Sequence, residues 1–147
     1  MTMRNRTADW TDPSVWPSRR IEGKRVLVCG GRDYDDRDHI WNTLTELNNS
    51  LGPFATVIHG CATGADHEAM IWAQTMPGRH HAPFQADWHR HGKAAGPIRN
   101  QRMIDEGKPD LVIAFPGGKG TADMVRRARA ARVEVIEVRC AVGEDVK

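Results

Sequence analysis

Hydrophobic residues along this chain follow two alternating spacings, one typical of buried strands and the other of amphipathic helices. Short apolar runs rich in β-branched residues predict strands at residues 24–29, 54–59, 79–86, 111–114 and 133–138. The third of these patterns is the weakest. After each of the first four runs, apolar residues recur every three or four positions, which predicts a helix. A strand followed by a helix, repeated with short connections, indicates an α/β fold with helices on both faces of a mostly parallel sheet.

Local signals mark the ends of the later helices. The third predicted helix has Pro97 at its first position and Gly107 at its end, where these residue types are favoured. The fourth helix is predicted from 121 to 131, with its arginines on the solvent side. Residues 87–93, which precede the third helix, are predicted to form a polar loop.

The length of the chain, 147 residues, fits one domain that buries a core without disulfides or a structural metal. We expect this domain to span residues 23–140, followed by a short polar tail at 141–147. Residues 1–22 lack both periodicities and are predicted as an N-terminal arm. Trp10 and Trp16 would pin the arm onto the body or onto a neighbouring subunit, although a loose tail fits the pattern equally well.

Charge and cysteine content narrow the classes of partner. The formal net charge is +2, with acidic and basic residues interspersed, so a strong attraction for nucleic acid or a membrane surface is absent. Cys29, Cys61 and Cys140 are far apart and odd in number, which indicates a reducing compartment. No apolar run approaches about 18 residues, and the N-terminus lacks the apolar segment of a signal peptide. We therefore expect a cytoplasmic protein with no membrane partner.

A glycine-rich segment after the fourth predicted strand gives the strongest indication of function. It reads Phe115-Pro116-Gly117-Gly118-Lys119-Gly120-Thr121-Ala122-Asp123. Glycines let a backbone approach a ligand closely, and the first amides of a helix have no internal partner, so the segment suits an anion such as phosphate. Because Lys119 precedes a glycine, the segment is not a Walker A motif. The alternative is a tight turn whose glycines serve only a positive φ.

Two further glycine-containing loops follow the first and second predicted strands. In the first loop, Arg32 and Asp33 would contact a phosphate and a ribose hydroxyl, or else pair with each other or cap the next helix. The full dinucleotide-binding fingerprint is not present there. In the second loop, Asp66 would bind a sugar hydroxyl or stabilise the first turn of its helix.

Cations crowd the start of the third predicted helix. Lys93, Arg99 and Arg102 lie where positive charge opposes the helix dipole, so an anion bound between them would remove the conflict. The alternative is pairing with carboxylates such as Asp87 or Asp105. Histidines are dense just before this helix, but their spacing matches no zinc motif, so we expect neither a metal site nor a cofactor.

All these loops would meet at one rim, because the carboxyl ends of parallel strands form the ligand crevice of such sheets. Glycine, arginine and aspartate together suit a ligand that has both a phosphate and a ribose. The residues expected to bind it are Gly30, Gly31, Arg32, Asp33, Gly60, Gly64, Asp66, Asp87, Lys93, Arg99, Asn100, Gly117, Gly118, Lys119, Gly120 and Thr121. If the protein is an enzyme, the expected catalytic residues are Arg99 and Asp123.

The same motifs resemble the YspA-like, cpYpsA-related branch of the SLOG superfamily. They lie at residues 30–33, 59–66, 86–103 and 115–123, within a resemblance that covers roughly residues 24–138. The resemblance implies a Rossmann-like three-layer sandwich and a ligand derived from a nucleotide, and it suggests a homodimer. The superfamily also contains the LOG phosphoribohydrolases, which activate cytokinins, and the DprA DNA-binding proteins.

Only part of the hydrolase pattern is present. Arg99 and Met103 match the ends of the Arg-Lys-x-x-Met helix start of the LOG enzymes, and residues 116–121 match the first part of their Pro-Gly-Gly-x-Gly-Thr-x-x-Glu loop. Met124 stands in place of the final glutamate. Asp123 would therefore have to supply the carboxylate that cleavage of an N-glycosidic bond needs.

These observations predict a protein that binds a nucleoside monophosphate or an ADP-ribose derivative, as a sensor or by sequestering it. A LOG-like N-glycosidase that releases a base is the first alternative, so enzymatic activity stays open. DprA-like binding of nucleic acid is the second, and the near-neutral charge and the scarcity of stacking aromatics argue against it.

Overall fold

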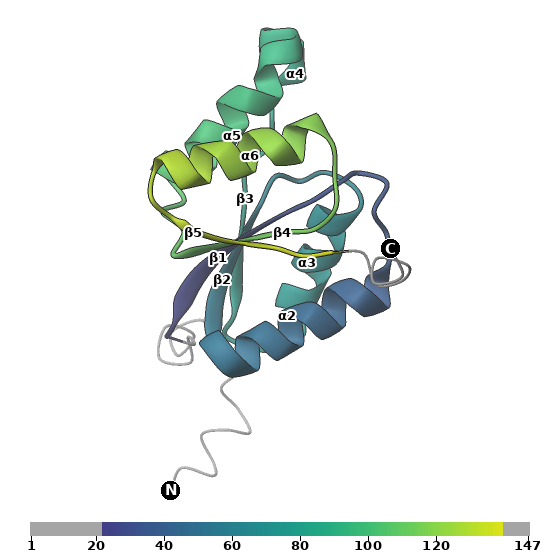
Figure 1. Ribbon diagram of the computed structural model, residues 1–147, viewed down its shortest axis with the longest axis vertical. Helices are drawn as coiled ribbons and strands as arrows, with labels where there is room; N and C mark the ends of the chain where they lie inside the picture. The colour runs from purple at the N-terminus through teal and green to yellow at the C-terminus, as the bar shows by residue number, and fades with distance from the viewer. Residues whose placement is uncertain (1–21, 140–147) are drawn as a thin grey trace, which may run out of the picture.

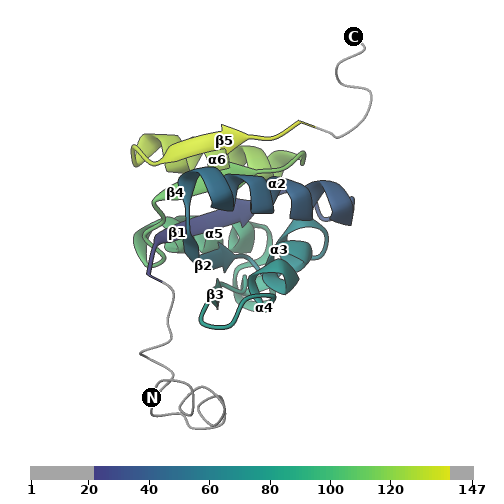
Figure 2. The ribbon, with the colours of Figure 1, turned by 90° about the horizontal axis from the view of Figure 1, so that it is seen from below.

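The computed structural model describes residues 22–139, and within this range the chain forms one sheet of five parallel strands. The strands lie in the order β3-β2-β1-β4-β5 (Figure 2). Their bounds are Lys24–Cys29 for β1, Phe54–His59 for β2, His80–Pro83 for β3, Leu111–Ala114 for β4 and Glu134–Glu137 for β5.

Helices cover both faces of this sheet (Figure 1). One face carries α2 and α3, and the other carries α5 and α6. A short helix, α4, and a 3₁₀ turn, η4, precede α5, and α4 projects from the end of the molecule. The bounds are Arg37–Leu51 for α2, Ala65–Ala73 for α3, Trp88–His91 for α4, Gly92–Ala94 for η4, Ala95–Asp105 for α5 and Lys119–Ala130 for α6. This arrangement confirms the predicted α/β, Rossmann-like three-layer sandwich.

The alternation of side chains along β1 explains how one strand supplies both halves of the core. Val26 and Val28 pack toward α2 and α3, whereas Leu27 and Cys29 pack toward α5 and α6. Successive side chains of a strand point to opposite faces, so a central strand must be apolar at every position. Each fully buried aliphatic side chain contributes about 1.5–3 kcal/mol to folding. The two half-cores therefore fix the sheet between its helix layers.

Several predicted boundaries differ from the observed ones. The helix α5 begins at Ala95, so Pro97 stands third rather than first, which the helix tolerates because its first turn needs no amide donor there. The loop predicted at 87–93 is largely helical, because the side chain of Asp87 accepts a hydrogen bond from the Arg90 amide and caps α4. The third strand is shorter than predicted, and α6 begins at Lys119, two residues early.

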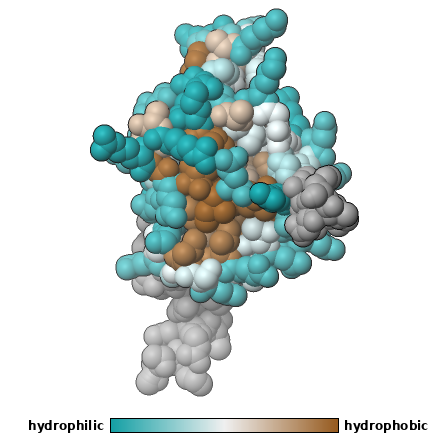
Figure 3. Space-filling view, in the orientation of Figure 1, coloured by the Kyte–Doolittle hydropathy of each residue, from teal (hydrophilic) through white to brown (hydrophobic). Residues whose placement is uncertain are grey.

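The edge strand β5 is less covered than the central strands. Val135 and Ile136 are half-buried, and Figure 3 shows an apolar area where this strand runs between α6 and α2, with hydrophilic residues around it. Among residues 22–139, no helix combines the length and apolar character that crossing a membrane requires. The arm predicted at 1–22 and the tail predicted at 141–147 lie almost wholly outside the described residues.

The strand order places a switch point between β1 and β4. The chain leaves β1 through α2 on one face, and it leaves the adjacent β4 through α6 on the other face. The two loops therefore diverge at the carboxyl end of the sheet and leave a crevice between them, which is where open α/β sheets bind ligands.

Candidate functional site

A cavity of about 940 Å³ opens at this switch point, between the loops after β1 and β4 and the first turns of α5 and α6. Most of the residues that the sequence predicted for ligand binding or turnover line it. They are Gly30, Gly31, Arg32, Asp33, Asp66, Lys93, Arg99, Asn100, Gly117, Gly118, Lys119, Gly120, Thr121 and Asp123. The glycine-rich segment and Arg99 therefore face one shared space, as the anion hypothesis requires.

The amino end of α6 forms one wall of the cavity. Its N-cap residue is Gly118, and no side chain caps the helix. The amides of Lys119, Gly120 and Thr121 have no carbonyl four residues earlier within the helix to accept their hydrogens. Together with the positive end of the helix dipole, these donors form a site suited to phosphate.

Two of the glycines in this wall have no steric reason to be glycine. A Cβ at Gly118 or at Gly120 would have no neighbouring atom within 4 Å, and neither residue has a positive φ. Gly117 differs, because a Cβ there would lie 2.7 Å from the Gly31 amide nitrogen and would also meet Thr121. The tight-turn alternative required a positive φ, which none of these three glycines has. Close packing explains Gly117, while Gly118 and Gly120 leave room for a ligand against the backbone.

Arg99 forms the facing wall of the cavity and carries a positive charge. Its Nη1 donates to the Gly60 carbonyl over 2.6 Å, and its Nε donates to Asn100 Oδ1 over 3.1 Å. Among the described residues, no carboxylate forms an ion pair with it. Burial lowers the pKa of Arg99, and the more distant carboxylate of Asp66 partly opposes this. A half-buried cation beside a cavity favours an anionic ligand.

The carboxylates proposed as alternative partners of Arg99 are engaged elsewhere. Asp87 caps α4, and Asp105 accepts a hydrogen bond from Gln101 over 3.0 Å. Arg102, predicted beside Arg99, instead pairs with Glu106 at 3.1 Å on the exposed side of α5.

Asp66 is buried on the floor of the cavity. Its carboxylate accepts a hydrogen bond from the Gly60 amide over 2.8 Å. Burial raises the pKa of Asp66 to about 6, although the amides of Gly60 and Ala62 and the charge of Arg99 act in the opposite direction. This carboxyl group therefore changes charge close to neutral pH.

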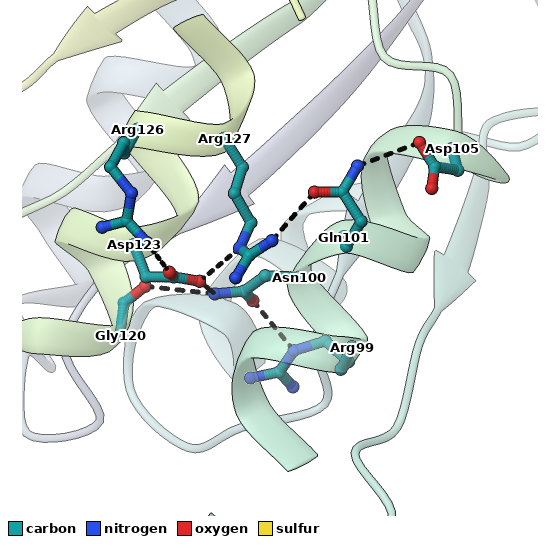
Figure 4. A network of polar contacts seen from close by, with 8 residues as sticks. All are labelled: Arg99, Asn100, Gln101, Asp105, Gly120, Asp123, Arg126 and Arg127. Carbon is teal, nitrogen blue, oxygen red and sulfur yellow. Dashed lines mark hydrogen bonds and ion pairs between the residues drawn. The ribbon is translucent and has the colours of Figure 1, made fainter. Parts of the chain in front are cut away.

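Asp123 belongs to α6, and its carboxylate accepts from donors on both α5 and α6 (Figure 4). Asn100 Nδ2 donates to its Oδ2 over 3.0 Å, Arg127 Nε donates to the same atom over 2.8 Å, and Arg126 contacts Oδ1. Burial opposes ionisation, but the hydrogen bonds from Arg127 and Asn100 outweigh it and lower the pKa of Asp123. The carboxylate is therefore ionised and its acceptor sites are largely occupied.

Three predicted residues do not line this cavity. Gly60 lines a smaller neighbouring cavity, Gly64 packs with a φ of 74° against the Arg32 carbonyl, and Asp87 caps α4. Sequence reasoning missed Trp88, which lines both cavities. The signal for Trp88 was a large aromatic in a polar segment that has no apolar periodicity.

One histidine of the histidine-rich region, His81, pairs with His59 at the end of β2. His59 Nε2 and His81 Nδ1 lie 3.0 Å apart, and their rings stack with centroids 5.2 Å apart. Burial lowers the pKa of His59 to about 4, with the charge of His81 acting in the same direction. In the part of the chain that the structure describes, no three His, Cys, Asp or Glu side chains are grouped to hold a metal ion.

The chain is similar in sequence to known proteins. Residues 24–91 match the YspA, cpYpsA-related SLOG family. The chain is also 41% identical over 121 residues to the Gene 61 protein of Mycobacterium phage D29, an alignment that covers 77% of this chain and 94% of that protein. The chain belongs to the YspA, cpYpsA-related SLOG family.

Membership of the SLOG family points to a nucleotide-related ligand or a related function. The matched segment runs from the start of β1 through β3 and ends at the last residue of α4. At the position where the LOG enzymes have glutamate, Met124 is fully buried against the half-core under α5 and α6. This member of the family therefore presents no carboxylate from that position.

Proposed function

We propose that this protein binds a nucleotide or another ribose-phosphate ligand, such as a nucleoside monophosphate or an ADP-ribose derivative, and that it senses or sequesters this ligand. One observation carries the proposal. The uncapped amino end of α6 and the guanidinium of Arg99, which has no ion pair among the described residues, line the same cavity.

The phosphate would lie at the amino end of α6. The amides of Gly120 and Thr121 would donate to its oxygens, and the open space at Gly118 and Gly120 would let the oxygens come within hydrogen-bonding distance. Arg99, and the exposed Lys93 and Lys119, would supply positive charge around it.

The ribose would extend toward the loop after β1. Asp33 is exposed and lines the cavity, so its carboxylate would accept hydrogen bonds from sugar hydroxyls. The buried Asp66 also lines the cavity, and its carboxylate would offer a second hydrogen-bond acceptor to the sugar. A ligand without a sugar would leave these carboxylates unused.

The contacts of Asp123 favour binding over hydrolysis. An ionised carboxylate that already accepts from Asn100 and Arg127 is a weak base and has little capacity left to position water. With Met124 in place of glutamate, the usual catalytic carboxylate of the hydrolases has no direct replacement.

An N-glycosidase that releases a base from a nucleotide is the second candidate, and the carboxyl group of Asp66 favours it. Its pKa, raised to about 6 by burial, suits an acid or base that works near neutral pH, and it lines the same cavity. Incubating the protein with AMP or ADP-ribose and following the free base by chromatography tests this candidate.

Calorimetric titration tests the binding proposal. Wild-type protein is titrated with AMP, ADP-ribose, ribose 5-phosphate and adenosine at one fixed salt concentration. We expect the three phosphate-containing compounds to bind and adenosine to bind at least about tenfold more weakly, because an arginine–phosphate contact contributes about 1.5–3 kcal/mol.

Two arginines on the same helix provide a matched pair of variants. Arg99→Gln removes the cation that lines the cavity, whereas Arg102→Gln removes one that pairs with Glu106 on the exposed side. We expect Arg99→Gln to weaken AMP binding and Arg102→Gln to leave it unchanged. Adenosine binding as tightly as AMP, or equal effects of the two substitutions, would contradict the proposal.

A further inference from the structure

Trp88 is an exposed aromatic residue at the place where two cavities meet. Trp88 is 48% exposed. It lines both the main cavity and the smaller cavity of about 210 Å³ beside it. The capped helix α4 carries the residue, and the ring lies near Gly96 of α5, where a Cβ would be 3.4 Å from the ring edge. The core of the domain does not need this side chain.

Arg32 lies against the same ring. Its guanidinium carbon is 5.2 Å from the centre of the Trp88 ring, and Arg32 also lines both cavities. Arg32 follows β1, whereas Trp88 follows β3, so the fold brings the two planar groups together from opposite sides of β2 in the sheet. Both side chains are exposed.

We propose that Trp88 and Arg32 form the stacking platform for a planar heterocyclic base of the ligand. This inference rests on the proposed function, which places the phosphate at the amino end of α6. The main cavity runs continuously from the glycines of that helix to Trp88, so a ribose phosphate at one end directs its base toward the other. Aromatic rings and guanidinium planes are the groups on which proteins stack nucleobases.

The smaller cavity supplies groups that would face the edge of such a base. Ala62 and Ala86 provide small apolar surfaces, and Gln85 provides an amide that both donates and accepts hydrogen bonds. Arg99 and Gly60 also line this smaller cavity. The ligand class is therefore a nucleotide with an intact base, rather than a sugar phosphate alone.

The competing explanation is structural, because the contact with Gly96 lets Trp88 dock α4 onto α5. Two substitutions separate the roles. Trp88→Leu keeps an apolar side chain for this contact but removes the aromatic plane, whereas Trp88→Phe keeps a plane. Circular dichroism and thermal unfolding of each variant check the fold.

The experiment compares AMP with ribose 5-phosphate, which has the same sugar phosphate and no base, by calorimetric titration of each variant. We expect wild-type protein to bind AMP more tightly than ribose 5-phosphate. Trp88→Leu should weaken AMP binding by about five- to a hundredfold and leave ribose 5-phosphate within about twofold of wild type. Trp88→Phe should retain most of the AMP affinity, and AMP should quench tryptophan emission in the wild type but not in Trp88→Phe.

The outcomes distinguish this inference from the function on which it rests. Equal affinity of wild-type protein for AMP and ribose 5-phosphate would overturn the base platform and leave phosphate binding intact. Equal losses for both compounds in Trp88→Leu would assign Trp88 a structural role and overturn the platform as well. Absence of binding to either compound in the wild type would overturn the proposed function, and the platform with it.

Discussion

Asp66 and Arg99 both form hydrogen bonds with the backbone of one residue, Gly60. The Gly60 amide donates to Asp66 over 2.8 Å, and the Gly60 carbonyl accepts from Arg99 over 2.6 Å. A Cβ at Gly60 would lie 2.5 Å from Arg99 Nη1 and 3.0 Å from Asp66 Oδ2, so this position has no room for a side chain. The residue that follows β2 thereby fixes a buried acid and a cavity-lining cation relative to each other without a direct ion pair between them.

The raised pKa of Asp66 predicts a specific pH dependence for the variant Asp66→Asn. The folded protein binds a proton at Asp66 at a pKa of about 6, whereas the unfolded chain binds it near the ordinary value of 3.8. Below pH 3.8 this preference contributes fully to stability, and the contribution is lost as pH rises through about 6. We expect the free energy of unfolding of Asp66→Asn relative to wild type to fall by about 2 kcal/mol from pH 7.5 to pH 4.

Urea unfolding of wild type and Asp66→Asn at several pH values measures this difference. The comparison cancels the groups that the two proteins share, including His59, whose lowered pKa destabilises both at acid pH. A constant difference between the two proteins from pH 7.5 to pH 4 would show that the Asp66 carboxyl has an ordinary pKa.

Gly120→Ala should separate ligand binding from stability. Gly120 is helical and a Cβ there meets no atom within 4 Å, so alanine should leave the free energy of unfolding unchanged or raise it by up to about 1 kcal/mol. The added methyl group would push a phosphate away from the helix amides, and we expect AMP affinity to fall about tenfold or more. Thermal unfolding and calorimetric titration measure the two effects.

A matched change at the other end of α6 serves as the control. Ala130 lies on the exposed last turn of α6. Ala130→Gly should therefore lower the free energy of unfolding by about 0.5–1 kcal/mol and leave AMP affinity unchanged. If AMP binds Gly120→Ala as tightly as wild type, the phosphate does not lie at the amino end of this helix.

Asp123→Asn should loosen the contact between α5 and α6. The amide keeps the shape of the carboxylate but removes the charge that Arg126 and Arg127 neutralise, and it cannot accept from all three donors. We expect a loss of about 1–3 kcal/mol in the free energy of unfolding, measured by urea denaturation. Glu106→Gln, which breaks the exposed pair with Arg102, should lower the free energy of unfolding much less than Asp123→Asn does.

The same variant examines the catalytic role that the sequence predicted for Asp123. If wild-type protein releases base from AMP and Asp123→Asn does so at an equal rate, Asp123 is a positioning residue of the α5–α6 contact and not a catalytic one. Lost release with AMP binding retained would instead assign Asp123 a part in the reaction.

The sequence by itself determined the layers of this fold and the position of its most informative loop. Apolar runs and three-to-four spacing predict strands and helices because they report which side of a local backbone segment is buried. The glycine-rich segment ending at Asp123 follows a buried strand and begins a helix. Residues that are consecutive in the chain therefore form the candidate anion site, and the sequence alone can reveal it. Boundaries were less accurate, since Asp87 and Pro97 act through local contacts that periodicity does not describe.

Tertiary structure alone decided which side chains meet. Arg99 and Gly60 are 39 residues apart in the chain, and Asn100 and Asp123 are 23 apart, yet both pairs form hydrogen bonds. The position of Trp88 over the cavity, against Arg32, likewise depends on the strand order. A hydrophobic pattern records how each segment is buried but carries no information on which segment lies beside it. The burial that raises the pKa of Asp66 and the partners that lower the pKa of Asp123 therefore follow only from the assembled fold.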